Sequence, residues 1–198
     1  MSIVVEHEKR RKEILEKALD VFMDEGFEDA TFQKIADRCG ITRTTLYIYF
    51  KNKKEIFKYS IKQLLKKVED SIQQIRGDST LNSVGKITNV LLSIMEQLTE
   101  NRSLLMVTLE YLLYISRTDV NPDEQVRRRT LRLRHILSNM VIEGIKKGEL
   151  APINVKIADD YLYSFIEAAI FHLVVLQHKS VEDLKKVVTQ AVLQLKRN

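Results

Sequence analysis

The 198-residue chain is poor in residues that interrupt helices and in residues that cross-link a chain. It contains two prolines, six glycines, one cysteine and no tryptophan. So few prolines and glycines disfavour a turn-rich β-sandwich, and a single cysteine excludes an intrachain disulfide and a cysteine-based metal site. Because 44% of the residues are hydrophobic, the chain can build a substantial core. The composition predicts an all-α protein in a reducing cytoplasm.

Long hydrophobic runs and enzyme motifs are also missing. The N-terminal stretch MSIVVEHEKRRKE has too few apolar residues for a secretory segment. The run 161–176 contains Glu167 and His172 and is shorter than the roughly 20 residues of a membrane span. The four histidines show no metal-ligand spacing, and no Gly-rich phosphate loop or nucleophile motif occurs. We therefore expect a soluble protein with no membrane partner, metal, cofactor or enzymatic activity.

Positive charge is concentrated in one segment. The formal net charge of the whole chain is only +5. From Thr31 to Lys67, however, ten lysines or arginines accompany two acidic residues, so this segment carries +8 and the remainder is slightly acidic. A basic segment of this kind fits nucleic-acid binding, although lysine clusters are also common on solvated helix faces.

Helix signals are closely spaced at the N-terminal end. Apolar residues recur at helical spacing over residues 8–25, and Gly26 stops the pattern. A short helix capped by Thr31 follows, then Gly40 as a left-handed turn residue, then a second short helix capped by Thr42. Two short helices joined by a glycine turn predict a helix-turn-helix at about residues 31–50, whose second helix enters the DNA major groove.

The remaining pattern is helical as well. Asn52 and Glu55 form a capping-box-like start for a helix that extends toward Ile75. Further helices are predicted at 83–99, 102–116, 123–147, 155–178 and 181–196, which gives about nine in total.

The predicted helix-turn-helix separates inward from outward side chains. The inward set is expected to be Phe22, Phe27, Ile35, Ala36, Ile41, Leu46 and Phe50. Outside, Arg43 suits the edge of a guanine, and threonines suit bases, phosphates or thymine methyl groups. Tyrosine hydroxyls and lysine ammonium groups suit phosphates.

The segment TFQKIADRCGITRTTLYIYFKNKKEIF resembles the DNA-binding signature of the TetR family of bacterial transcriptional regulators. It has the opening threonine, the Ile-Ala pair, the glycine turn, Thr-Leu-Tyr, an aromatic pair, and Lys-Asn-Lys before glutamate. The family more often has glycine, alanine or proline at position 44 and histidine at position 49. The resemblance implies DNA contacts from Thr31, Thr42, Arg43, Thr44, Thr45, Tyr47, Tyr49 and Lys53.

The resemblance, dense over Glu8 to Lys67, also implies a domain organisation and partners. Residues 8–68 would form the DNA-binding domain, and residues 69–198 a helical domain for ligand binding and dimerisation. A homodimeric repressor would bind a near-palindromic DNA operator on the bacterial nucleoid and leave it when a small, largely apolar effector binds.

Two sets of residues in the second domain are candidates for these roles. An apolar stripe over 181–195, joined by residues of the preceding helix, agrees with a four-helix dimer interface. The predicted interface residues are Ile166, Ile170, Leu173, Val174, Val181, Leu184, Val188, Ala191, Val192 and Leu195. The predicted pocket residues are Met95, Leu98, Met106, Leu109, Glu110, Leu113, Tyr114, Tyr161, Phe165 and Glu167. Each of the latter also fits plain core packing or, for the acids, a salt bridge.

Other interpretations of the sequence remain open. A DNA-binding module joined to a helical protein-interaction domain, without an effector, fits the same helix pattern. A helical enzyme or carrier with a similar N-terminal segment would show no salt-sensitive, sequence-specific duplex binding. The arginine-rich stretch 125–135 fits either an anionic ligand or, more commonly, a solvated helix face that pairs with acids.

Overall fold

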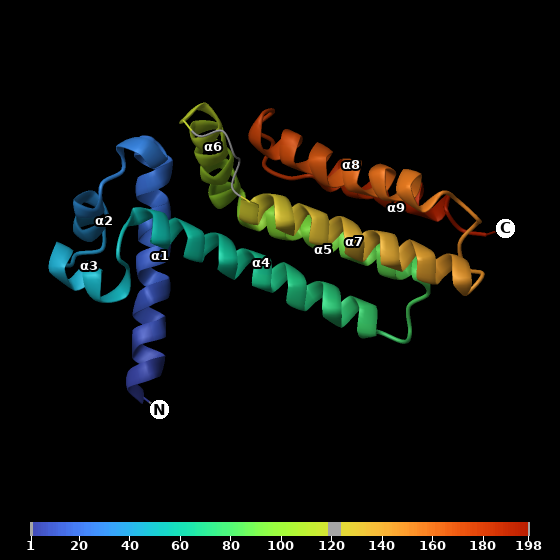
Figure 1. Cartoon of the computed structure of the whole chain (residues 1–198), viewed down its shortest axis with the longest axis horizontal. Helices are drawn as coiled ribbons and strands as arrows, with labels where there is room; N and C mark the ends of the chain where they lie inside the picture. The colour runs from blue at the N-terminus through green and yellow to red at the C-terminus, as the bar shows by residue number, and fades with distance from the viewer. Residues whose placement is uncertain (1, 119–123, 198) are drawn as a thin grey trace. The chain divides into compact units, whose positions relative to one another are not determined.

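The computed structural model describes residues 2–118 and 124–197 (Figure 1). Within these residues it has nine α-helices and no strand, which confirms the all-α prediction. The helices are α1 (Ser2–Asp29), α2 (Phe32–Arg38), α3 (Arg43–Tyr49), α4 (Lys53–Gly77), α5 (Ser83–Glu100), α6 (Arg102–Thr118), α7 (Glu124–Lys146), α8 (Val155–Val174) and α9 (Glu182–Leu193). In this described part of the chain, no helix is both long enough and apolar enough to span a bilayer.

Packing divides the chain into two compact units. Unit one comprises Met1–Leu65 with Ser103–Val120, and unit two comprises Lys66–Arg102 with Asn121–Asn198. Nearly all of α6 therefore packs with the N-terminal helices, a grouping that the sequence pattern did not predict. The functional boundary expected between residues 68 and 69 stays a prediction.

The core of unit one joins aromatic and aliphatic side chains from α1, α2, α3, α4 and α6. Six of the seven predicted inward residues are buried, and Ile41 is half-buried. Helix α6 contributes Leu104, Val107 and Tyr111. The Tyr111 ring lies 4.7 Å from the ring centroid of Phe27 and 4.9 Å from that of Phe57. Through these ring contacts, α6 packs against the end of α1 and the start of α4.

Gly26 interrupts α1 at the position where the sequence pattern stops. Its backbone has φ 78° and ψ 162°, a conformation open almost only to glycine. The next amide, of Phe27, donates to Oε1 of Glu110 on α6 at 3.3 Å. A Cβ atom on residue 26 would lie 2.6 Å from the same oxygen. Gly26 therefore permits both the chain reversal and the close approach of α6.

Lys53, the first residue of α4, binds the C-terminal end of α1 and the residue that follows it. Its Nζ donates to the carbonyl oxygens of Phe27 at 2.8 Å, Glu28 at 2.6 Å and Ala30 at 2.8 Å. The ammonium group also lies 5.1 Å from the centroid of the Phe27 ring. Burial lowers the pKa of Lys53, although the nearby acids Asp29 and Glu28 favour the charged form. All three ammonium donors are thus directed at backbone carbonyls.

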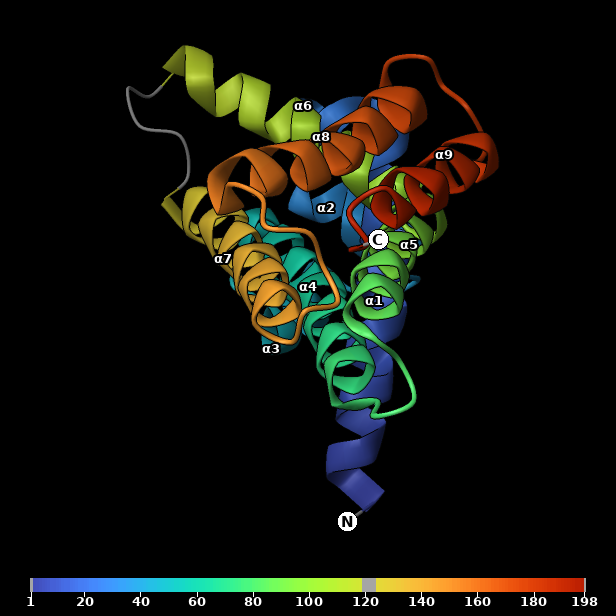
Figure 2. The same ribbon diagram turned by 90° about the vertical axis from the view of Figure 1, so that its right-hand side faces the viewer.

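Unit two is built around α5, which packs against α7, α8 and α9, while α7 also packs against α8 (Figures 1 and 2). Helix α8 ends at Val174, earlier than predicted, and Gln177 just beyond it has a positive φ of 54°. After α9 the chain returns to the α7–α8 connection. There the amide of Arg197 donates to the carbonyl of Glu149 at 3.1 Å.

The contacts of Lys53 lead to a stability prediction. We expect Lys53→Met, which keeps the aliphatic stem but removes three charged donors, to lower the free energy of unfolding by about 1–3 kcal/mol. Denaturant-induced unfolding followed by circular dichroism measures this change. Lys54→Met, at the exposed neighbouring position, is the matched control and should change stability by less than about 0.5 kcal/mol. Equal effects of the two substitutions would contradict the structural role of Lys53.

Candidate nucleic-acid interface

Local hydrogen bonds define the two short helices of unit one. Thr31 Oγ1 accepts the amide of Lys34 at 3.2 Å, and Thr42 Oγ1 accepts the amide of Thr45 at 3.0 Å. Gly40, between the helices, has a φ of +65°. These contacts confirm both predicted N-caps and the predicted left-handed turn. Helices α2 and α3 therefore form a helix-turn-helix.

Helix α3 is anchored by one side and presents polar groups on the other. Leu46 is fully buried, whereas Thr42, Arg43, Thr44 and Tyr47 are exposed. Arg43 Nη2 donates to the Tyr47 hydroxyl at 3.1 Å, so these two side chains are already ordered together. The hydroxyls of Thr42 and Thr45 lie 2.8 Å apart.

Ile48 was missed by the sequence-based list of contact residues. Its side chain is 68% exposed, which is unusual for isoleucine. It lies four residues after Thr44 and therefore on the same side of α3. The sequence could have identified Ile48 as an outward-facing residue, because it lies midway between Leu46 and Phe50, which both face inward. An exposed aliphatic side chain here suits the methyl group of thymine.

Two predicted phosphate contacts have other partners in the structure. Tyr49 is half-buried against the core, and its ring stacks on His7 of α1. Lys53 directs its ammonium group at three carbonyls. Its role as a phosphate ligand stays a prediction, and such a contact would compete with those carbonyls.

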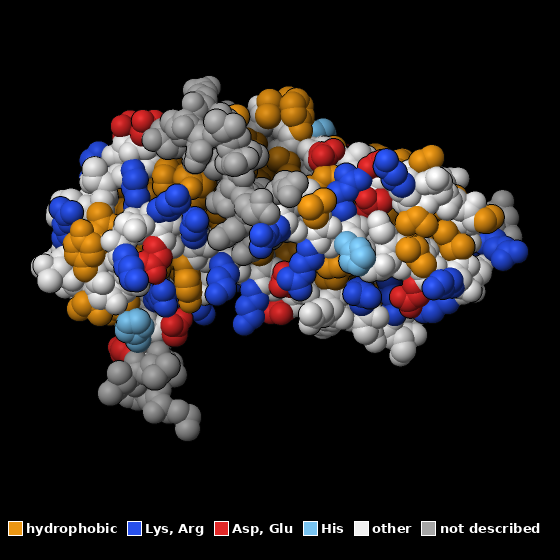
Figure 3. Space-filling model, viewed as in Figure 1, with side chains coloured by type: hydrophobic (Ala, Val, Ile, Leu, Met, Phe, Trp, Pro, Cys, Tyr) orange, Lys and Arg blue, Asp and Glu red, His pale blue; other side chains and the backbone are white. Residues whose placement is uncertain are grey.

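Other cations near the start of α4 are more accessible. Lys51 and Lys54 are exposed. Asn52 Oδ1 accepts the amide of Glu55 at 2.9 Å, while the Glu55 carboxylate accepts the amide of Lys51 at 2.6 Å. On the left of Figure 3, lysine and arginine side chains lie among exposed hydrophobic ones over α2, α3 and the start of α4. A surface that combines basic and apolar side chains is expected where a protein contacts DNA.

The predicted dimer-interface residues are divided between buried and half-buried positions. Ile166, Leu173, Val181, Val188 and Val192 are buried in the core of unit two, where α5 packs against α8 and α9. Ile170, Val174, Leu184, Ala191 and Leu195 are half-buried. The predicted dimer interface stays a prediction.

A different apolar stripe of α8 is exposed. Its members are Ile157, Tyr161, Phe171 and Val175, with 69%, 40%, 50% and 60% of their surface accessible. Together with Ser164 and Ala168 between them, they recur at alternating intervals of four and three residues, so they share one face of the helix. We call this set the α8 stripe.

The predicted pocket residues are divided between the two units. Met106, Leu109, Glu110 and Leu113 belong to unit one, and Met95, Leu98, Tyr161, Phe165 and Glu167 belong to unit two. The side chain of Tyr114 lies outside the described residues. Met95 is fully buried, Glu110 binds the Phe27 amide, and Leu113, Tyr161 and Glu167 are exposed. The pocket stays a prediction.

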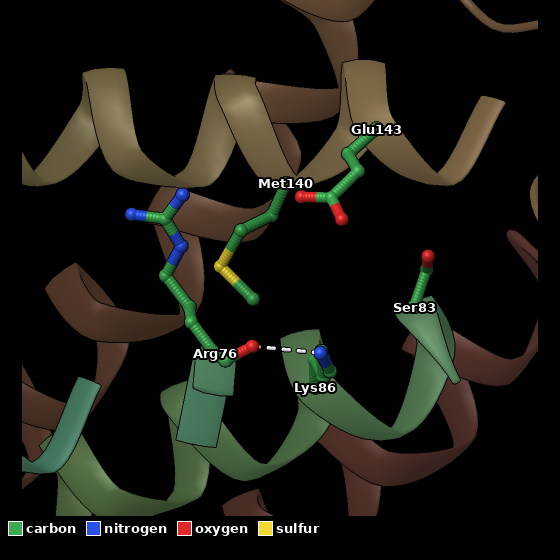
Figure 4. Close-up of a pocket in the computed structure, with 5 residues that line it drawn as sticks. All are labelled: Arg76, Ser83, Lys86, Met140 and Glu143. Carbon is green, nitrogen blue, oxygen red and sulfur yellow. Dashed lines mark hydrogen bonds between the residues drawn. The ribbon is translucent and has the colours of Figure 1, made fainter. Parts of the chain in front are cut away.

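A small hollow between α4, α5 and α7 does not have the character of that pocket (Figure 4). It is lined by Arg76, Ser83, Lys86, Met140 and Glu143. Lys86 Nζ donates to the carbonyl of Arg76 at 2.7 Å. Glu143 pairs with Lys147 at 2.7 Å, and this hydrogen bond lowers the pKa of Glu143. The side chains of Lys86 and Glu143 thus have protein partners, and Met140 is the only apolar residue among the five that line the hollow.

The arginine-rich start of α7 pairs with acids where it is described. Arg132 contacts Glu69 of α4 at 2.9 Å. Arg134 contacts the buried Asp159 at 2.8 Å and also pairs with Asp160, both on α8. For these two arginines, helix-to-helix ion pairing accounts for the charge better than an anionic ligand does.

Comparisons with known proteins point to one family. Residues 14–59 match the model for bacterial regulatory proteins of the tetR family. The chain is 24% identical over 170 residues to the fatty acid metabolism regulator protein of Bacillus subtilis strain 168, covering 82% of this chain and 84% of that relative. It is 26% identical over 157 residues to the transcriptional repressor KstR2 of Mycolicibacterium smegmatis, covering 79% and 74%.

A solved structure agrees with this assignment at the level of the fold. The transcriptional regulator FadR from Bacillus subtilis, in complex with stearoyl-CoA, superposes with a TM-score of 0.69. The two chains are 22% identical, and the match covers 93% of this chain and 96% of that one. Helices α2 and α3 therefore lie within the segment that matches bacterial regulatory proteins of the tetR family, and over most of its length the chain is similar to transcriptional regulators.

Proposed function

We propose that the protein is a ligand-responsive repressor that binds a near-palindromic operator as a homodimer, on the nucleoid in the bacterial cytoplasm. The observation that carries this proposal is the capped α2–Gly40–α3 unit, which exposes Arg43 and neighbouring threonines within a basic segment. Repression is supported by the repressor KstR2, which matches over 79% of this chain, whereas a relative named as an activator matches over 38%.

DNA reading is assigned to the exposed side of α3. Arg43 makes two hydrogen bonds to a guanine edge, while Thr42, Thr44, Thr45 and Ile48 contact bases or thymine methyl groups. Contacts with phosphates position the helix-turn-helix on the duplex. They come from Tyr47, Tyr49 and Thr31, together with lysines at the start of α4. The Arg43–Tyr47 hydrogen bond keeps the guanidinium extended before DNA arrives.

Dimerisation is assigned to the α8 stripe. Helix α8 has two apolar faces, of which one packs in unit two and the other remains exposed. Four large apolar side chains at coiled-coil-like spacing are favourable for packing against the same helix of a second copy. In such a two-fold symmetric contact, both subunits contribute the same surface. The dimer then presents two helix-turn-helix units to one operator.

The effector is proposed to be a long-chain acyl thioester. Support comes from the relatives named for fatty acid metabolism and from the complex of the Bacillus regulator with stearoyl-CoA. Helix α6 offers a route for the response because Glu110 and Tyr111 contact the end of α1 directly. An effector that prefers a different position of α6 would displace the reading head and weaken operator binding by thermodynamic linkage.

Arg43 provides the test of DNA reading. We expect Arg43→Ala to relax base preference at one operator position, at a cost of about 1–3 kcal/mol with the preferred base and little cost with the others. The measurement is fluorescence anisotropy with a panel of operator duplexes that vary one base pair at a time. A uniform loss across all base variants would assign Arg43 to a phosphate instead.

Phe171, near the end of the α8 stripe, provides the test of dimerisation. We expect Phe171→Glu to raise the dimer dissociation constant at least about tenfold, because an unpaired carboxylate would be buried in each subunit. Sedimentation equilibrium at micromolar concentration measures the change. Leu131→Glu, at a similarly exposed apolar position on α7, is the control and should leave the dimer intact. A Phe171→Glu protein that remains dimeric would exclude the α8 stripe.

A further inference from the structure

The first turns of α1 pack against the end of the DNA-reading helix. The His7 ring stacks on Tyr49, the last residue of α3, with ring centroids 4.7 Å apart and an interplanar angle of 28°. One turn later, the Arg11 guanidinium lies 4.9 Å from the centroid of Phe50 and 4.1 Å from that of Tyr59. The N-terminal part of α1 is therefore part of the reading head.

These contacts give His7 a fixed position. Arg11 is held between two aromatic rings, and the Tyr59 hydroxyl donates to Glu8 at 3.4 Å. The following turn buries Ile14 and Leu15 in the core of unit one. Because α1 is continuous from these residues back to His7, the backbone of His7 is held beside Tyr49.

We propose that His7 and Tyr49 together bind one backbone phosphate of the operator. The inference rests on the proposed function, in which Tyr49 is a phosphate contact. Stacking brings an imidazole beside the phenol ring, so that a ring N–H and the hydroxyl can donate to one phosphate group. His7 adds a positive charge when it is protonated.

The charges near the pair are mixed. Arg10, on the same helix, is close enough to Tyr49 for electrostatic interaction and is itself paired with Glu13 at 2.7 Å. Glu8 is engaged by the Tyr59 hydroxyl and lies 3.8 Å from Arg11, and Glu6 is exposed next to His7. The neighbouring acids thus largely have partners, and a phosphate would be the new anion at this position.

The proposal predicts that operator affinity rises as the pH falls from 8 to 6. Imidazoles change charge between about pH 8 and pH 5, whereas the phosphodiester stays anionic throughout. Lowering the pH therefore adds a cation to the phosphate contact, and affinity rises.

The experiment compares full-length variants on one operator duplex at pH 6 and pH 8, by fluorescence anisotropy at constant ionic strength. The wild type should bind at least about threefold more tightly at pH 6, and His7→Gln should lose most of this ratio. His7→Lys keeps a charge at both values, so it should bind at pH 8 about as tightly as the wild type does at pH 6. His178→Gln, exposed in unit two, should retain the wild-type ratio.

The outcomes separate this inference from the proposed function. Should His7→Gln keep the wild-type pH ratio, or His7→Lys bind no tighter than His7→Gln at pH 8, the shared phosphate contact is wrong. Thermal unfolding of each variant identifies losses that come from misfolding. Failure of the wild type to bind any duplex sequence-specifically at either pH would instead overturn the proposed function.

Discussion

Three carbonyl oxygens between Phe27 and Ala30 converge on the ammonium group of Lys53, and the geometry of the reading head depends on this contact. These carbonyls lie after the kink at Gly26, at or just beyond the C-terminal end of α1, where a helix leaves its last carbonyls without intrahelical partners. Lys53 supplies those partners from the start of α4. The orientation of α2 and α3 relative to α1 is thereby linked to the first turn of α4.

Helix α6, from the middle of the sequence, packs against the same end of α1. Glu110 accepts the amide of Phe27, and Tyr111 packs against the rings of Phe27 and Phe57. A helix that the sequence assigns to the regulatory domain is thus built into the core of the DNA-binding unit. In the proposed mechanism, a movement of α6 would reach α2 and α3 through the end of α1 and the start of α4.

The local features of the head were predictable from the sequence, but its distant contacts were not. The caps at Thr31 and Thr42 and the turn at Gly40 depend on residues three or four positions apart, and the structure confirms them. From the sequence alone, Lys53 cannot be distinguished from the other lysines of the basic segment, because its carbonyl partners are 23 to 26 residues away. Glu110 reads as an isolated acid because Phe27 lies 83 residues away.

The second unit shows why an apolar stripe does not identify its own partner. The stripe of α9 that includes Val188 and Val192 has helical spacing suited to a dimer, yet it is covered by other helices of the same chain. Helix α8 is apolar on both sides, so the sequence alone could not distinguish the face toward the core from the face that includes Ile157 and Phe171. Only the packed structure separates the two.

In the proposed mechanism, binding of the effector controls the affinity of the protein for its operator. It is tested most directly by the dissociation constant of the full-length protein for its operator duplex, measured without ligand and at saturating stearoyl-CoA. Bound stearoyl-CoA is expected to weaken operator binding at least about fivefold, which corresponds to a coupling free energy of about 1–3 kcal/mol. An unchanged operator affinity, with stearoyl-CoA shown to be bound, would contradict it.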